Sequence, residues 1–379
     1  MKYRKFGPLD FEVSALGFGA MRLPVKGEES SEIDEEQAIK MIRTAIDNGV
    51  NYVDTAWPYH GKESEPLVGK ALRDGYRGKV KLATQMLSWE LEERKDLDHY
   101  LNKQLERLEV DKIDFYLLHA LNREYWEKYQ KLNATEWLDQ KIAEGKIGHA
   151  GFSFHDDLQI FKEIVDSYQW TFCQIQYNYL DKDYQAGQEG LKYAADKGLA
   201  VVIMEPLMGG KLAAEPPEEI KEIWKQGDIQ DLNPVKWALY WLWNQPEVSV
   251  VLSGMSELSQ VEENLQLADE FSKDAMGENQ VKALEKSGEK YREISPVECT
   301  GCNYCMPCPN ELSIPTLFRL YNDAEVYGRY EENKETYYGD LLNKKASDCV
   351  ACGECLDACP QNLPIIELMK ETAEYFGDT

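Results

Sequence analysis

Eight of the nine cysteines in this 379-residue chain fall in two short runs near its C-terminus. The first run holds Cys299, Cys302, Cys305 and Cys308, and the second holds Cys349, Cys352, Cys355 and Cys359. Thiols this close together form disulfides or bind metal. The N-terminal residues lack the apolar stretch of a secretory signal, so we expect a cytoplasmic protein, in which disulfides are disfavoured. Structural zinc competes better, because paired C-x-x-C motifs suit tetrahedral Zn²⁺.

In each run, three cysteines at three-residue intervals precede a fourth cysteine and a proline. Such a loop can place three thiolates on three iron corners of a cubane cluster. The second run resembles the bacterial ferredoxin signature, and the first is one residue shorter before its last cysteine. This resemblance implies two 4Fe–4S clusters. If ferredoxin-like exchange of the fourth ligands holds, Cys359 joins the first three cysteines of the first run, and Cys308 joins those of the second.

Other residues capable of chemistry follow β-rich runs earlier in the chain. Tyr59 comes shortly after Asp54, which lies in one such run, and His119 ends another. A carboxylate, a phenol and an imidazole are the groups that proteins use to hold or transfer a proton. Tyr59 and His119 could equally pack in a core, but their placement after strand-like runs favours a catalytic role.

Eight short apolar runs alternate with longer amphipathic stretches over the first 285 residues. The expected strands are residues 16–21, 51–55, 80–85, 113–119, 149–153, 172–177, 200–205 and 249–254. The clearest expected helices are residues 35–48, 96–108 and 158–168. Regular βα alternation of this length predicts an α/β fold of the (β/α)₈ TIM-barrel type. A doubly wound open sheet is the alternative, weakened because no G-x-G-x-x-G turn follows any of these strands.

A charged segment, residues 271–294, reads as one helix and ends before Ser295-Pro296. We place a domain boundary near residue 285. The expected organisation is therefore a barrel domain at residues 1–285 and a small, mainly helical two-cluster ferredoxin-like domain at residues 286–379.

Several motifs together make the chain resemble the aldo/keto reductase superfamily over most of residues 1–270. They are Asp54-Thr55-Ala56 with Tyr59 and Gly61, Leu117-Leu118-His119, Gly151-Phe152-Ser153, Glu205-Pro206-Leu207-Met208-Gly209-Gly210 and Glu262-Glu263-Asn264-Leu265. Phe154-His155-Asp156 and the cysteine tail look like the branch of that family fused to a ferredoxin-like 4Fe–4S domain. The order and spacing of the motifs are more specific than any one of them.

The resemblance implies an NAD(P)-dependent oxidoreductase that reduces a carbonyl group, with the cofactor bound in extended form. Tyr59 would be the general acid, His119 would orient the substrate oxygen, and Asp54 would anchor a lysine that tunes the phenol. In this sequence, however, the strand that should end in that lysine carries Gln85. A neutral amide cannot supply the positive charge that stabilises phenolate.

Gln85 leaves three interpretations open: a changed reaction, a weakened reductase, or an introduced substitution that silences the enzyme. Lys62 could take the place of the missing cation, whereas Lys81 would lie about 13 Å deeper along the strand. The changed reaction would be non-redox acid–base chemistry, such as elimination or epimerisation. A further class is an electron-transfer or regulatory protein with a degenerate barrel.

Cofactor contacts are also implied by the resemblance. Ser153 and Gln174 match residues that hold the nicotinamide carboxamide, and Met204 stands where many relatives stack an aromatic ring. The pyrophosphate loop matches Gly209, Gly210 and Lys211. The adenosine end matches Ser253, Gly254, Gln260, Glu263 and Asn264. Gln260 stands where an arginine often binds the 2′-phosphate, so NADP and NAD both remain open.

The charge of the chain limits its partners. With 42 basic and 68 acidic side chains the net charge is −26, which argues against nucleic acid and anionic membranes as main partners. Residues 290–379 carry 16 acidic and 8 basic side chains. We therefore expect a small-molecule substrate and, for the cluster domain, a basic redox partner protein.

Overall fold

The computed structural model describes residues 1–27, 29–272, 275–339, 342 and 344–378. They form two compact units that interleave along the chain. The first unit is Met1–Pro206 with Ala238–Ala275, and the second is Leu207–Trp237 with Met276–Thr379. No helix among the described residues is long and apolar enough to cross a membrane. The domain boundary near residue 285 stays a prediction.

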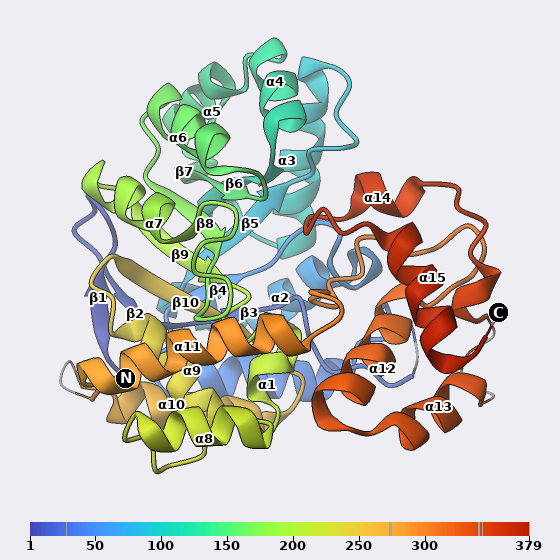
Figure 1. Cartoon of the computed structure of the whole chain (residues 1–379). Helices are drawn as coiled ribbons and strands as arrows, with labels where there is room; N and C mark the ends of the chain where they lie inside the picture. Colours follow the sequence, from blue (N-terminus) through green and yellow to red (C-terminus); the bar gives the residue numbers. More distant parts are fainter. Residues whose placement is uncertain (28, 273–274, 340–341, 343, 379) are drawn as a thin grey trace. The chain divides into compact units, whose positions relative to one another are not determined.

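The first unit is a closed barrel of eight parallel strands, as the alternating pattern predicts (Figure 1). The barrel order is β10-β3-β4-β5-β6-β7-β8-β9. The strands are β3 (Leu16–Gly19), β4 (Tyr52–Asp54), β5 (Lys81–Met86), β6 (Ile113–Leu121), β7 (Ile147–Phe154), β8 (Phe172–Gln176), β9 (Ala200–Met204) and β10 (Val248–Gly254). Each expected strand is present with small changes at its ends. Their carboxyl ends therefore meet at one mouth of the barrel.

Helices follow the strands. They are α1 (Glu35–Asp47), α2 (Ser64–Ala71), α3 (Arg94–Leu108), α4 (Arg123–Lys131), α5 (Ala134–Ala143), α6 (Leu158–Ser167), α7 (Gly187–Asp196), α9 (Pro234–Trp243) and α10 (Leu258–Glu270). In α1, the Asp34 carboxylate caps the first turn by accepting from Gln37 N at 3.3 Å. Gly49, with φ of 98°, follows the end of α1. The helix therefore ends at Asp47, one residue before its expected end.

A hairpin precedes the barrel and was not expected from the sequence. It pairs β1 (Tyr3–Lys5) with β2 (Glu12–Ser14) in antiparallel fashion. Phe6, in its turn, is fully buried with Tyr52, Phe115 and Phe172, and its ring centroid lies 4.6 Å from that of Phe115. These aromatic side chains belong to the hydrophobic core of the barrel, so the hairpin supplies part of that core.

We expect Phe6→Ala to lower the free energy of unfolding by about 3–5 kcal/mol, because it leaves a cavity among large rings. Tyr3→Ala, at a position that is 47% exposed, is the control and should cost at most about 1 kcal/mol. Urea denaturation of both variants measures the difference. Equal losses would show that Phe6 does not support the barrel core.

The second unit is mainly helical in its described residues, as expected. Its helices are α8 (Glu218–Gln226), α11 (Glu278–Ile294), α12 (Ile314–Tyr327), α13 (Tyr330–Tyr338), α14 (Glu354–Ala358) and α15 (Ile365–Phe376). Phe318, Tyr337, Met369 and Phe376 form part of its core, and the rings of Tyr337 and Phe376 stack at 4.5 Å. Seven of the eight clustered cysteines are partly buried in this unit.

The expected single helix over residues 271–294 is wrong in its first part. The preceding helix, α10, ends at Glu270, and Phe271 leaves helical geometry with ψ of 134°. Helix α11 begins only at Glu278, where the Gln280 side chain accepts from Gly277 N at 2.8 Å. Residues 273–274 lie outside the described part of the chain. Gly277 and its contact with Gln280 therefore begin a new helix. In the sequence this start is hidden, because charged residues continue on both sides of it.

Candidate active site and cysteine cavities

Four polar side chains from successive strands meet at the mouth of the barrel. Asp54 ends β4, Gln85 is next to last in β5, His119 lies near the end of β6, and Ser153 near the end of β7. All four are buried, and Gln85 is fully inaccessible. In an otherwise apolar barrel such groups require polar partners. The mouth is therefore a concentrated polar site.

Ser153 orients the Gln85 amide. Its hydroxyl donates to Gln85 Oε1 at 2.7 Å and accepts from Ala120 N at 2.8 Å. The Gln85 Nε2 donor has no hydrogen-bond partner of normal geometry among the described residues. Gln85 thus directs its oxygen to Ser153, while its amide group also acts on the Asp54 carboxyl.

Asp54 lies near Gln85 in an apolar setting. Burial raises the pKa of the Asp54 carboxyl well above its usual range, and the nearby Gln85 amide opposes this only in part. Asp54 Oδ2 has no hydrogen bond of normal geometry among the described residues. The pair therefore favours a neutral carboxyl and provides no cation.

The two lysines that could replace the missing cation, Lys62 and Lys81, form ion pairs with other carboxylates. The Lys62 ammonium lies 3.7 Å from Glu90 and over the Trp57 ring. Lys81 begins β5 and lies 3.5 Å from Asp114. The contacts of Lys81 agree with its expected depth, away from the carboxyl end of the strand.

The candidate proton donor lies beside the candidate substrate-orienting group. Tyr59 begins the short helix η1 (Tyr59–Lys62), and its ring centroid is 6.0 Å from that of His119, in an edge-to-face arrangement. The ring centroid of Trp89 lies 5.5 Å from that of His119. Tyr59 is half-buried.

His119 is neutral at physiological pH. Burial, with a smaller effect from His155, lowers its pKa to about 3. Burial also lowers the pKa of His155 to about 4, against the hydrogen bond from Gln185. A neutral imidazole donates from one ring nitrogen and accepts at the other, so His119 can orient a carbonyl oxygen without protonating it.

The lowered pKa of His119 predicts a pH-dependent stability. The unfolded chain takes up the proton near pH 6.5 and the folded chain only near pH 3, so stability is lost as pH falls through this window. We expect His119→Gln to flatten this part of the curve, measured by urea denaturation between about pH 7 and pH 4.5. The exposed His99→Gln should keep the slope. An unchanged slope in the His119 variant would contradict the assignment.

A buried network behind Gln85 was missed from the sequence. The fully buried Glu65 carboxylate accepts from Thr84 Oγ1 and Gln104 Nε2, both at 2.7 Å, and from Arg107 Nε at 2.8 Å. Gln104 Nε2 also donates to the Gln85 carbonyl at 2.9 Å. The network thus secures the strand backbone at the site. A glutamate on the apolar face of a helix was its only sequence signal.

The expected nicotinamide contacts lie on neighbouring strands. Ser153 and Gln174 are paired across β7 and β8, and Gln174 Nε2 lies 3.7 Å from the Met204 sulfur. Gln174 is 2% exposed, and its Oε1 has no hydrogen-bond partner among the described residues. That oxygen is an acceptor suited to an amide N–H₂ group such as a carboxamide.

The expected adenosine-end residues surround the start of α10. Asn264 Nδ2 donates to Ser253 Oγ at 3.1 Å, and Ser256 N donates to the exposed Gln260 at 2.9 Å. Glu263 lies on the same helix and is half-buried. A Cβ on Gly254 would come within 3.2 Å of Arg22.

Arg22 is a second residue that sequence reasoning missed. Its guanidinium lies 3.4 Å from Glu205, which directly follows β9, so it adds a positive charge near the strand ends. In the sequence, the only indication of this role was its position shortly after strand β3.

The expected pyrophosphate loop belongs to the second unit. Gly209, Gly210 and Lys211 lie in the short helix η3 (Met208–Ala213). Gly209 and Gly210 have φ of 65° and 99°, values that favour glycine.

The clustered cysteines surround two separate cavities of the second unit. One is lined by Cys299, Cys302, Cys305 and Cys359, and the other by Cys308, Cys349, Cys352 and Cys355. Among the described residues, no three His, Cys, Asp or Glu side chains are grouped to hold a single metal ion. Four thiols around a small, mainly apolar cavity are a donor set that fits a cubane iron–sulfur cluster.

Electrostatic contacts divide the cysteines in the same way. Burial raises the pKa of Cys305 to about 12, and the sulfurs of Cys302, Cys299 and Cys359 add to the rise. Burial also raises the pKa of Cys355, with contributions from Cys349, Cys352 and Cys308. In each cavity, therefore, the cysteine from the other run is an electrostatic neighbour.

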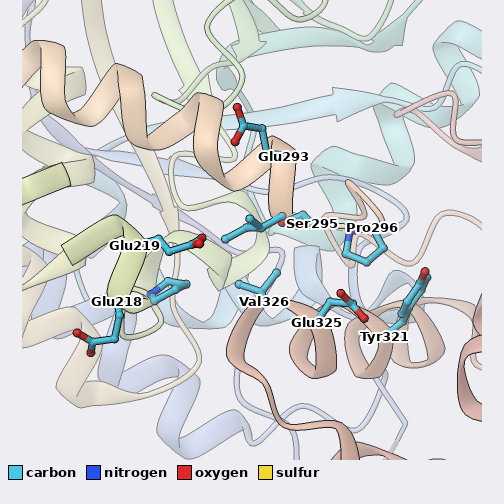
Figure 2. A pocket seen from close by; sticks show the side chains of 10 residues that line it. Glu218, Glu219, Glu293, Ser295, Pro296, Tyr321, Glu325 and Val326 are labelled. Carbon is cyan, nitrogen blue, oxygen red and sulfur yellow. The ribbon is translucent and has the colours of Figure 1, made fainter. Parts of the chain in front are cut away.

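A further cavity of about 780 Å³ lies between α8, α11 and α12 of the second unit (Figure 2). Its lining includes Glu218, Glu219, Glu293 and Glu325. The Lys290 ammonium is 3.4 Å from both Glu219 and Glu293. Carboxylates repel phosphate groups, so this cavity is unsuited to a dinucleotide.

Comparisons with known proteins agree with the barrel and the cysteine runs. The family model "Aldo/keto reductase family" matches residues 15–286, and "4Fe-4S dicluster domain" matches residues 298–363. The chain therefore belongs to the aldo/keto reductase family. It is an oxidoreductase of that family with a C-terminal 4Fe–4S dicluster domain.

Individual relatives are distant in sequence, but each covers about three quarters of this chain. The uncharacterized oxidoreductase YqkF of Bacillus subtilis is 27% identical over 75% of this chain and 96% of its own length. L-galactose dehydrogenase of Arabidopsis thaliana is 28% identical over 78% of this chain and 97% of its own. The holo form of aldo-keto reductase AKR11C1 from Bacillus halodurans superposes with a TM-score of 0.63, at 26% identity, over 76% and 96% of the two chains.

Proposed function

We propose that the barrel reduces a small carbonyl substrate with NADPH or NADH, and that Tyr59 donates the proton. The observation that carries this proposal is the convergence of Tyr59, His119, Gln85 and Asp54 at the strand ends, with a phenol next to a neutral imidazole. The acceptor Gln174 Oε1, buried without a partner among the described residues, fits a nicotinamide carboxamide.

Each residue of the site has a separate role in the proposed reaction. His119 orients the carbonyl oxygen by donating a hydrogen bond, and Tyr59 gives that oxygen a proton. The Gln85 amide, which also acts on Asp54, can bond the phenol or the substrate, but it lowers the phenol pKa less than an ammonium would. Trp89 packs against His119, with the two ring centroids 5.5 Å apart. Bound reduced nicotinamide would supply the hydride.

The dinucleotide would extend over three groups of residues. Its nicotinamide end is assigned to Ser153, Gln174 and Met204, its pyrophosphate to Gly209, Gly210 and Lys211, and its adenosine end to Ser253, Gly254, Gln260, Glu263 and Asn264. No arginine stands at position 260 to select a 2′-phosphate, so both NADP and NAD are admitted.

We assign residues 1–285 to a barrel domain and residues 286–379 to a cluster domain. The cluster domain would hold two 4Fe–4S clusters. The two cavities, each with one cysteine contributed by the other run, support exchanged fourth ligands. Such clusters carry one electron at a time and would connect the enzyme to a basic redox partner in the cytoplasm.

Gln85 favours a second candidate function. A buried neutral amide beside Asp54, whose pKa burial raises, leaves the phenol without its tuning cation, which suits acid–base chemistry other than hydride transfer. Elimination or epimerisation would then be the reaction. A protein limited to electron transfer or regulation would instead bind no nicotinamide cofactor.

Fluorescence titration of anaerobically purified protein with NADPH and NADH tests these proposals. Reductase function predicts saturable binding and loss of the cofactor's absorbance when small aldehydes and ketones are added. Binding without oxidation, accompanied by a change in the substrate alone, would favour the acid–base alternative. Absence of binding would overturn reductase function and would be the result expected of a protein limited to electron transfer or regulation.

A further inference from the structure

The proposed pyrophosphate loop touches the first cysteine run within the second unit. A Cβ placed on Gly209 would lie 2.0 Å from the Thr300 carbonyl oxygen and 2.8 Å from its carbonyl carbon. Real Cβ atoms do not approach other atoms so closely, and φ of 65° at Gly209 also disfavours any side chain. The two backbones are therefore in direct contact, and only glycine permits it.

The contacted carbonyl belongs to the peptide that also bonds a cysteine sulfur. Thr300 is 3% exposed and, with Cys299 and Cys302, lines the first cysteine cavity. The N–H of the next residue, Gly301, donates to Cys299 Sγ at 3.4 Å. Because the Thr300–Gly301 peptide is planar, its C=O and N–H move together. A displacement of the carbonyl by the Gly209 loop must therefore change the N–H···S contact.

Hydrogen bonds to ligand sulfur set the reduction potential of an iron–sulfur cluster. We propose that the Thr300–Gly301 peptide couples dinucleotide binding at the Gly209 loop to the reduction potential of the cluster held by Cys299, Cys302, Cys305 and Cys359. This inference rests on the proposed function of that loop. By linkage, the oxidation state of the cluster changes dinucleotide affinity by the same factor.

The second cysteine cavity provides an internal control. It is lined by Cys308, Cys349, Cys352 and Cys355 and does not include Thr300. Its cluster should keep its potential when the loop is occupied.

The test uses ADP-ribose and its 2′-phosphorylated form, which keep the pyrophosphate but carry no nicotinamide to be reduced. Anaerobic redox titration of the full chain, followed by electron paramagnetic resonance, gives both cluster potentials with and without the probe. We expect one potential to shift and the probe affinity to differ by about fivefold or more between oxidised and reduced protein. A tenfold difference would correspond to about 59 mV for a one-electron couple.

Two glycine variants separate the contact from general strain in the loop. Gly209→Ala meets the Thr300 carbonyl, whereas Gly210→Ala, with φ of 99°, meets no atom of the described residues within 4 Å. Gly209→Ala should alter the first cluster's potential or spectrum even without the probe, and Gly210→Ala should not. If the wild-type chain binds the probe and neither potential moves, the coupling is overturned. If the chain binds no probe in either oxidation state, the nucleotide role of the loop falls, and the coupling falls with it.

Discussion

Gln85→Lys is expected to raise the rate of carbonyl reduction by about 10²-fold at neutral pH, the range that a tuned general acid contributes. The new ammonium would replace a buried neutral amide between Asp54 and the reacting groups. It would stabilise the charged Asp54 carboxylate, whose pKa burial now raises, and lower the pKa of the Tyr59 phenol. Steady-state assays with a panel of small aldehydes, with cofactor saturating, measure the change in kcat.

Control variants show whether the gain comes from charge. Gln85→Met has similar size without a positive charge and should give no gain. Gln85→Lys combined with Tyr59→Phe should lose the gain, because the phenol is the group being tuned. A thermal melt of each variant shows whether the barrel remains folded. An unchanged or slower rate in folded Gln85→Lys protein would show that the missing cation does not limit proton transfer.

Paired cysteine replacements are expected to remove either one cluster or both, according to the cavities. Cys305→Ala with Cys359→Ala alters a single cavity and should leave about four of the roughly eight iron atoms of two 4Fe–4S clusters. Cys355→Ala with Cys359→Ala alters both cavities and should leave almost none. Iron and sulfide analysis after anaerobic purification gives the counts.

The buried Cys173→Ala is the matched control, since it lies in β8 of the barrel and should retain all iron. If instead the Cys355–Cys359 pair retains about four iron atoms, each run holds its own cluster and the fourth ligands are not exchanged. Bound zinc in a colourless protein would contradict iron–sulfur clusters altogether.

The barrel could be predicted because most of its strands are apolar runs that alternate with helices. Runs such as residues 113–119 and 200–205 carry this signal by themselves, since parallel strands are buried on both faces. The β1–β2 hairpin has strands of three residues, too short for a pattern. Its role depends on Phe6 reaching Phe115, a contact between distant parts of the chain that no local pattern contains.

The sequence could predict that candidate polar residues lie at the strand ends, but not the contacts that join them. Strand ends indicated Asp54, Gln85 and His119, because the carboxyl ends of barrel strands share one face. The supporting network of Glu65 and Gln104 joins two helices to a strand, and apart from the place of Glu65 on an apolar helix face the sequence gives no sign of it. The contact of Gly209 with Thr300 is likewise a matter of tertiary packing.

Deuterium transfer measures the proposed reaction most directly. NADPH or NADH deuterated on the transferred position of the nicotinamide ring is incubated anaerobically with the loaded protein and a small aldehyde, and the alcohol is examined by mass spectrometry. The proposed reductase predicts deuterium on the former carbonyl carbon, formed slowly by the natural chain and faster by Gln85→Lys. Cofactor binding with no deuterium in any product, from either protein, would contradict hydride transfer at this site.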